Sequence, residues 1–166
     1  MKTILLMTVS ADGYIARLND EAPWSQEEFA RCNEFIKKVG NVVVGHKTYE
    51  IMKEAGDFDK DVETVVLSKD KNANAGNVHF VSSPKEALEY LSSKNFQTVV
   101  VSGGMTTNTA FLDAGLLDEI VLDIEPIILG EGLTLFSKQK RDIKMELISI
   151  EKLDGHSSRA HYKIIK

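Results

Sequence analysis

The segment Val99–Leu112, VVVSGGMTTNTAFL, constrains the fold more than any other part of this chain. Three valines lead into a pair of glycines, and a run rich in threonine then leads to an apolar helical start. This order predicts a buried strand, a glycine turn and a helix N-terminus. Gly103 and Gly104 have no Cβ, so a ligand can approach the backbone closely. The N–H groups and the helix dipole would then act on an anion, typically a phosphate, although the same turn can be a plain tight connection.

The bulk properties restrict the class of protein. With 166 residues, of which 43% are hydrophobic and 27% charged, we expect one globular domain over 1–166. A net charge of −5 and the lack of a basic run argue against nucleic-acid or membrane partners. A single cysteine, Cys32, excludes an internal disulfide and a cysteine-cluster zinc site. It fits a reducing cytoplasm, and no segment is typical of a signal peptide or a membrane span.

The clearest helix in the sequence covers Ser25–Val39. Ser25 and Glu28 form the pattern of a capping box, and Gly40 is a suitable stop. The helical spacing predicts one apolar stripe facing the core, formed by Phe29, Cys32, Phe35, Ile36 and Val39. Trp24 precedes the cap, where it either staples the helix to the core or walls a pocket.

A second glycine turn follows another buried strand at Asn41–Gly45. The helix after it begins with His46, Lys47 and Thr48. Cations at a helix start oppose the helix dipole, so they are explained if an anion lies beside them. Lys47 by itself is also compatible with an ordinary solvated lysine.

The remaining pattern alternates strands and helices and ends in strands alone. It predicts an α/β fold with a mostly parallel sheet and an antiparallel hairpin over 143–153 and 158–165, with its turn at 154–157. Ligands of such sheets lie beyond the carboxyl ends of the strands. Small, polar or basic residues recur there, namely Ser10, Gly45, His46, Ser68, Lys69 and the run from Ser102 to Thr107. The loop 17–23 after the first strand is either functional or a plain surface connection.

Two glycine turns and several basic residues suit a ligand with more than one phosphate. A dinucleotide has a pyrophosphate, and its NADP form adds a 2′-phosphate, for which His46, Lys47 and Lys69 are candidates. The G-x-G-x-x-G fingerprint of the common dinucleotide fold is absent.

Taken together, these motifs resemble the dihydrofolate reductase-like superfamily. The chain looks closest to stand-alone relatives of the reductase domain of the riboflavin-biosynthesis deaminase–reductase. The matching motifs run in the family's order over nearly the whole chain: S-A-D-G-Y-I-A (10–16), A-P-W (22–24), V-V-V-G-H-K-T-Y-E (42–50), V-V-L-S (65–68), V-S-G-G (101–104), F-L-D-A-G-L-L-D-E-I (111–120) and P-I-I-L-G-E-G (126–132).

The resemblance implies a three-layer α/β/α fold and an NADPH-dependent reductase. Gly45, His46, Lys47 and Thr48 would hold the adenine-side ribose and phosphates, and Ser68 and Lys69 would reach the 2′-phosphate. The pyrophosphate would lie on Gly103, Gly104, Met105, Thr106 and Thr107, with a cis peptide bond at the double glycine, and Ser102 before them would also bind the cofactor. The loop 10–23 would cover the nicotinamide, with Ile15 and Ala16 against its ring. Relatives are commonly homodimers.

The chain also departs from the resemblance. Dihydrofolate reductases place a carboxylate five residues after the A-P-W tryptophan, where this chain has Phe29. Glu28 is one residue away and is already explained as a capping residue. Trp24, Glu28 and Phe29 are expected to border the substrate pocket. The zinc deaminase signature, H-x-E with P-C-x-x-C, is absent, so the chain is not the two-activity enzyme.

Two aspartates are candidate proton donors. Asp123 stands in mid-strand, where aspartate is disfavoured, and is either an acid in the pocket or a solvent-facing residue. Asp12 is either a second acid or a residue that shapes its turn.

Three functions follow. The first is hydride transfer from NADPH to a C=N or C=O carbon of a small pyrimidine- or pterin-like heterocycle. The second is dihydrofolate reduction, with Glu28 or Asp123 as the carboxylate. The third is nucleotide binding without turnover.

Overall fold

The computed structural model describes residues 1–56, 59–69, 76–139, 142–153 and 155–166, so Asp154 of the expected hairpin turn lies outside the described residues. The helices are α1 (Gln26–Val39), α2 (His46–Ala55), α3 (Pro84–Ser93) and α4 (Met105–Asp113). The strands are β1 (Lys2–Ser10), β2 (Tyr14–Ala16), β3 (Asn41–Gly45), β4 (Glu63–Leu67), β5 (Val78–Val81), β6 (Thr98–Val101), β7 (Glu119–Glu125), β8 (Leu133–Thr134), β9 (Met145–Lys152) and β10 (Ser158–Ile164).

One sheet of eight strands forms the centre of the molecule, in the order β5-β4-β3-β6-β1-β7-β10-β9. The strands from β5 to β7 pair in parallel, whereas β10 is antiparallel to both β7 and β9. This confirms the mostly parallel sheet with an antiparallel edge hairpin. The structure adds a small antiparallel sheet of β2 and β8 that the sequence pattern did not predict.

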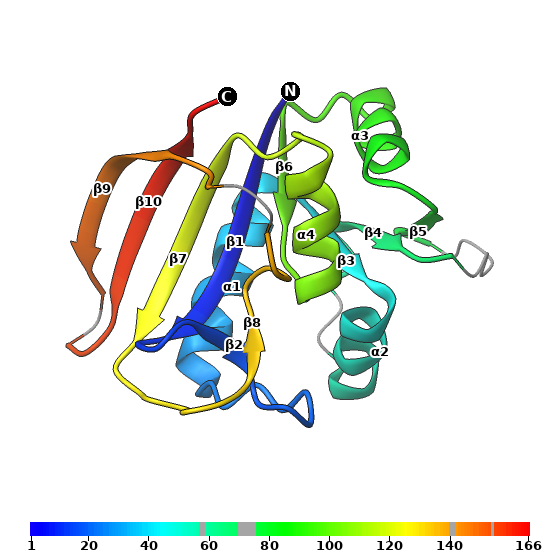
Figure 1. Cartoon of the computed structure of the whole chain (residues 1–166). Coiled ribbons are helices and arrows are strands. Elements are labelled where there is room, and N and C mark those ends of the chain that lie inside the picture. Colours follow the sequence, from blue (N-terminus) through cyan, green and yellow to red (C-terminus); the bar gives the residue numbers. More distant parts are fainter. Residues whose placement is uncertain (57–58, 70–75, 140–141, 154) are drawn as a thin grey trace.

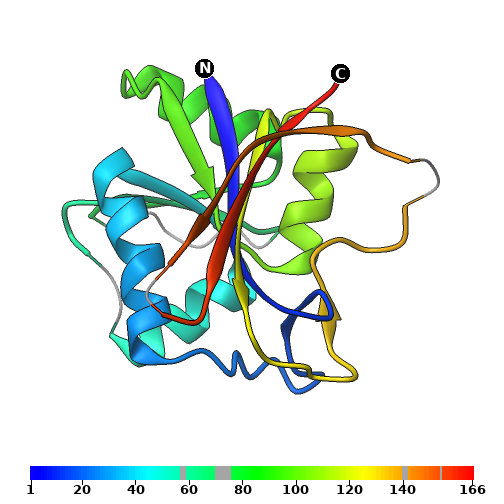
Figure 2. The same ribbon diagram turned by 90° about the vertical axis from the view of Figure 1, so that its left-hand side faces the viewer.

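Helices cover both faces of the sheet and give three layers (Figures 1 and 2). On one face, α1 and α2 cover a core cluster built on the alternating positions Ile4, Leu6, Val42 and Val44. On the other face, α3 and α4 pack on Leu5, Val43, Val99 and Val101. Every second residue of a strand points to the same face, and both faces are covered, so runs such as Val42–Val44 and Val99–Val101 are apolar on both faces. None of the helices in the described ranges is long and apolar enough to cross a membrane.

Helix α1 begins and ends as expected. Ser25 and Glu28 form the capping box, and Gly40 ends the helix with a left-handed φ of 83°. The expected apolar stripe is confirmed for Ile36, which is buried, and for Cys32, Phe35 and Val39, which pack against the same cluster.

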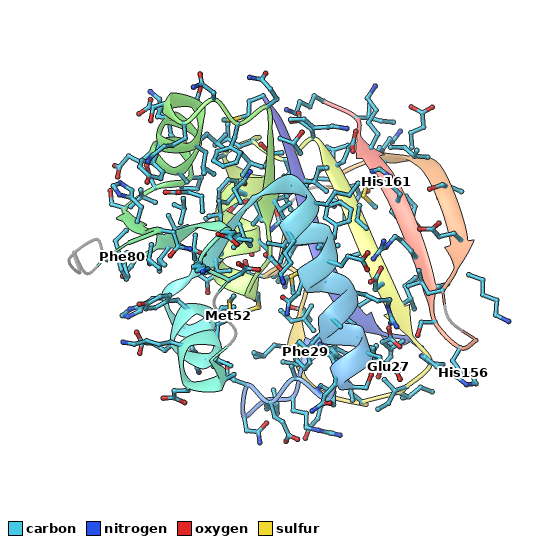
Figure 3. The ribbon with its side chains drawn as sticks, turned by 180° about the vertical axis from the view of Figure 1, so that it is seen from behind. Glu27, Phe29, Met52, Phe80, His156 and His161 are labelled. Atoms are coloured by element: carbon cyan, nitrogen blue, oxygen red, sulfur yellow. The ribbon has the colours of Figure 1, made fainter. Side chains whose placement is uncertain are left out.

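The stripe is wrong for Phe29, which is 43% exposed. Figure 3 shows Phe29 on the flank of α1 that faces α2, with Glu27 on the opposite flank. The inward positions of the first turns are taken instead by polar side chains. Arg31 contacts β7, and Glu28 lies against Glu125. The spacing alone could not show that α1 begins over a polar part of the sheet.

Candidate active site

The two glycine turns lie side by side at the carboxyl edge of the sheet, the lower edge in Figure 1. Strands β3 and β6 are neighbours, so the turns that follow them meet. The Gly45 N–H donates to the Gly103 carbonyl at 2.8 Å, and the Ser102 N–H donates to the Val43 carbonyl at 2.9 Å. The Gly103–Gly104 peptide bond is cis, as the resemblance implied.

Both helices that start here begin without a side-chain cap. The N-cap residues of α2 and α4 are Gly45 and Gly104, and neither first turn carries an acidic residue. The first N–H groups of a helix have no partner within the helix, so an anion can accept hydrogen bonds from them.

The glycines of these turns are glycines for different reasons. A Cβ on Gly45 would lie 2.5 Å from Thr107 Oγ1, so packing of the protein itself excludes a side chain there. Gly103 has a φ of +101°, which disfavours other residues. A Cβ on Gly104 would have Thr48 Oγ1 at 3.7 Å as its nearest neighbour, which is ordinary contact. Because protein atoms do not crowd the space where a Gly104 side chain would be, a ligand can approach the backbone closely there.

Of the polar residues predicted at the ends of β3 and β4, the structure brings some into contact and leaves others apart. His46 Nδ1 lies 3.5 Å from Ser68 Oγ, and His46 Nε2 lies 3.5 Å from Glu50. Lys47 forms an ion pair with Asp20, so the loop 17–23 lies across the start of α2. Lys69 is exposed at the end of β4.

The segments around β2 and β8 form a second layer at the same edge. Asp12 accepts hydrogen bonds from Ser10 Oγ at 2.7 Å and from the Gly130 N–H at 2.8 Å. The Ser10 hydrogen bond, with help from the backbone N–H groups, lowers the pKa of Asp12. Ile15 and Ala16 are buried where β2 pairs with β8. The turn-shaping role expected as an alternative for Asp12 is therefore what its contacts show.

Asp123 lies inside the molecule. It is 0% exposed, and Arg159 donates to both of its oxygens at 2.6 and 2.8 Å. The solvent-facing alternative is wrong, because Arg31 from α1 and Arg159 from the neighbouring strand β10 lie against Asp123. Arg31 reaches the same cluster and donates to Glu125 at 2.7 Å. Ser157 also donates to Glu125.

Arg31, Glu125 and Arg159 were not predicted from the sequence. The available signal was the second charge on the inward face of β7, two residues after Asp123. Cys32 also borders the cluster, 3.5 Å from Thr8 Oγ1, and burial raises the pKa of its thiol. Trp24 is half-buried just before α1.

A cavity of about 360 Å³ lies between α1, α2 and the start of β4. Its apolar lining includes Ile36, Val42 and Val62, together with Met52 of α2. The cavity is at the amino-terminal half of β3 and β4, away from the glycine turns. None of the predicted site residues lines it.

Comparison with protein families decides the relationship. The model of the RibD C-terminal domain matches residues 1–157. The chain belongs to the RibD C-terminal domain family.

Individual relatives of this family agree in length and fold. The chain is similar to two uncharacterized Bacillus subtilis proteins: YwjB, 25% identical with 97% of each chain covered, and YyaP, 24% identical with 89% of this chain and 87% of YyaP covered. It shares its fold with a putative riboflavin biosynthesis protein from Shewanella sp. PV-4, with a TM-score of 0.81, 22% identity and complete coverage of both chains.

The family includes longer proteins. A Thermotoga maritima diaminohydroxyphosphoribosylaminopyrimidine deaminase/5-amino-6-(5-phosphoribosylamino)uracil reductase matches with a TM-score of 0.77 and 18% identity. The alignment covers 99% of this chain and 56% of that one. The RibD C-terminal domain is the reductase part of such proteins.

Proposed function

We propose that this RibD C-terminal domain is an NADPH-dependent reductase. One observation carries the proposal: two helix N-termini without side-chain caps meet through the Gly45–Gly103 hydrogen bond. The family is known to use NADPH. When bound, NADPH supplies a hydride for a C=N or C=O carbon of a small heterocycle, and the protein orients the two rings.

The residues present fit this cofactor. The open position above Gly104 and the N–H groups of α4 up to Thr107 suit the pyrophosphate. Gly45 to Thr48 would take the adenine-side ribose and phosphates. Ser68 and Lys69, with His46 beside Ser68, would hold the 2′-phosphate, and Lys47 would join them after leaving Asp20. Ile15 and Ala16 would lie against the nicotinamide.

The substrate is proposed to be a pyrimidine- or pterin-like heterocycle, next to α1 and β7. The side chains proposed to border it are Trp24, Glu28 and Phe29, with Asp123 and Asp12 as the acids that the sequence offers. Contacts with Arg159 and with Ser10 occupy the carboxylates of these two aspartates, so neither is arranged to give up a proton.

Turnover assays separate the candidate functions. NADPH oxidation is measured with 5-amino-6-(5-phosphoribosylamino)uracil and, in parallel, with dihydrofolate. Oxidation with the aminouracil supports the proposal, and oxidation with dihydrofolate supports the second candidate. That candidate is favoured by Glu28, which is one residue before the position where dihydrofolate reductases have a carboxylate and which lies against Glu125 of β7. Tight NADPH binding with no turnover of either compound indicates a nucleotide-binding protein, and no binding of NADPH contradicts the proposal.

We also propose a homodimer. All eight residues of the edge strand β9 are exposed, including Leu147 at 52% and Ile150 at 64%. Long apolar edges invite pairing with another strand. Antiparallel pairing of two β9 strands about Ser149 sets Glu146 opposite the partner's Lys152, so a second copy complements this edge in charge. Sedimentation should show a dimer that Ile150→Lys dissociates; an unchanged dimer would exclude this interface.

With its free Cys32, the protein is proposed to be cytoplasmic.

A further inference from the structure

Residues 132–137, which we call the linking segment, carry β8 and lie between two parts of the proposed cofactor site. On one side, Leu133 pairs with Ala16 at the end of β2. Gly132 also packs closely there, because a Cβ on Gly132 would lie 2.3 Å from the Ala16 carbonyl oxygen. On the other side lies α4, whose first turn is proposed to hold the pyrophosphate. Figure 1 shows β8 between β2 and α4.

Side chains of α4 hold the linking segment by hydrogen bonds. Asn108 Nδ2 donates to the Leu135 carbonyl at 3.0 Å. The Ser137 N–H and the Ser137 hydroxyl both donate to Thr109 Oγ1, at 2.9 and 3.1 Å. Thr109 Oγ1 itself donates to the Met105 carbonyl at 2.7 Å, which fixes the direction of the hydroxyl. Asn108 and Thr109 come directly after the residues proposed to bind the pyrophosphate, so the same helix serves both tasks.

Asn108 is a costly residue for its position. It is 0% exposed inside α4, and asparagine is a poor helix former. Within the described residues its Oδ1 is buried and has no hydrogen-bond partner, which lowers stability. For stability alone an apolar residue would be better, like Phe111 and Leu112 on the buried side of the same helix. What Asn108 provides is the N–H donor to the linking segment.

The sheet of β2 and β8 is too small to fix its own position. β2 has three residues and β8 has two, and a pair of strands this short is not stable by itself. Ser10 fixes the start of β2, because its hydroxyl oxygen accepts a hydrogen bond from the Tyr14 N–H at 2.9 Å. The end of β2, with Ile15 and Ala16, is held by β8, and β8 is held by α4.

We propose that Asn108 and Thr109 are positioning residues of the cofactor site, an inference that rests on the proposed reductase function. They fix the separation between the turn that would bind the pyrophosphate and Ile15 and Ala16, which would contact the nicotinamide. Two half-sites at a fixed separation bind the two ends of one ligand better than half-sites that move. Hydride transfer also requires the nicotinamide C4 to be held close to the substrate carbon.

Thr109→Val tests the link with the smallest change. It keeps the shape of the side chain and removes the oxygen to which Ser137 donates. Asn108→Leu is the second variant and removes the donor to Leu135. Thr109→Ser retains the hydroxyl and should behave as the wild type. Thr64→Val, in β4 outside the proposed site, is the matched control, because it also removes a buried threonine hydroxyl that makes a hydrogen bond within the chain.

Hydrogen exchange of the protein alone tests whether the link exists. We expect the amides of β2 and β8 to exchange faster in Thr109→Val and in Asn108→Leu, whereas β1 and β6 keep their wild-type protection. Thr109→Ser and Thr64→Val should leave β2 and β8 as protected as in the wild type. Wild-type protection of β2 and β8 in both Thr109→Val and Asn108→Leu overturns the proposal.

Two ligands distinguish positioning from general damage to the site. Calorimetric titration compares NADPH with 2′-phospho-ADP-ribose, the fragment that lacks the nicotinamide ring. In Thr109→Val and Asn108→Leu the Kd of the fragment should be unchanged, and the Kd of NADPH should rise about two- to tenfold, the range for one lost hydrogen bond. An equal loss of affinity for both ligands, or no loss for either, overturns the proposal.

A wild type that binds neither ligand refutes the proposed function, and with it the role in cofactor binding. Hydrogen exchange needs no ligand and still decides whether Asn108 and Thr109 hold β2.

Kinetics test whether the nicotinamide is displaced. With the aminouracil or dihydrofolate, whichever is turned over, Thr109→Val and Asn108→Leu should lower kcat by up to about 100-fold, the effect of a displacement of about 1 Å. NADPH deuterated at C4 should give an isotope effect on kcat at least as large as in the wild type, because the slowed step is hydride transfer. An unchanged kcat in both variants, or a smaller isotope effect, overturns the proposal.

Discussion

Replacing Gly45 with alanine should destabilise the fold in the absence of any ligand. The new Cβ would lie 2.5 Å from Thr107 Oγ1, and contacts become ordinary only at 3.4 Å, so about 0.9 Å of separation has to open. Thr107 is 4% exposed and cannot swing into solvent. Overpacking of this kind costs about 1–3 kcal/mol. For a domain of this size the loss corresponds to a fall in Tm of roughly 2–12 °C.

Gly104→Ala is the matched variant, because its Cβ meets only Thr48 Oγ1 at 3.7 Å and its φ of −76° suits any residue. Its stability should equal or slightly exceed that of the wild type. The methyl group would occupy the position proposed for the pyrophosphate, so NADPH affinity should fall at least about tenfold, or roughly 1.4 kcal/mol. Thermal and urea melts measure the first effect, and calorimetric titration the second. Unchanged stability in Gly45→Ala refutes the packing argument, and unchanged NADPH affinity in Gly104→Ala refutes the proposed cradle.

Three further substitutions test other parts of the structure. Gly132→Ala places a Cβ 2.3 Å from the Ala16 carbonyl oxygen, so it should lower the free energy of unfolding by about 1–3 kcal/mol in urea melts. Asp12→Asn removes a carboxylate whose pKa is lowered below 3.8, so the wild type should lose stability relative to the variant as the pH falls through that lowered value; parallel curves would contradict this. Arg159→Met leaves Asp123 without its bidentate partner and should cost about 3–5 kcal/mol, most of which the added change Asp123→Leu should restore.

Much of the fold follows from local patterns in the sequence. The central strands are runs of β-branched residues such as Val42–Val44, which read as buried on both faces. The start of α1 at Ser25 follows from the capping box, because the two hydrogen bonds involved are local.

Features that depend on contacts between distant segments could not be predicted in this way. The pairing of β2 with β8 joins Tyr14 to Thr134, and neither segment is long enough to show a strand pattern. Phe29 has the spacing of a core residue, yet it is exposed because Glu28 and Arg31 face the polar part of β7.

In the candidate site, too, the features that follow from local patterns were predictable and those that depend on contacts between distant segments were not. Glycine turns after parallel strands lie at the same edge of the sheet, so it was predictable that Gly45 and Gly103 share that edge, whereas their direct contact depends on the pairing of β3 with β6. The charge cluster around Asp123 was not, because its partner Arg159 comes from an antiparallel strand 36 residues further on. Residue types showed that the chain has acids, and only the fold shows which of them lie against cations.

The affinity of the wild-type chain for NADPH compared with NADH is the direct test of the proposed NADPH site. The two cofactors differ only in the 2′-phosphate, which we assign to Ser68, Lys69 and the basic residues at the start of α2. Calorimetric titration of each cofactor, with Tm shifts as a second readout, should give tighter binding and a larger Tm increase for NADPH. Equal affinities, or no binding of either cofactor, would contradict the account.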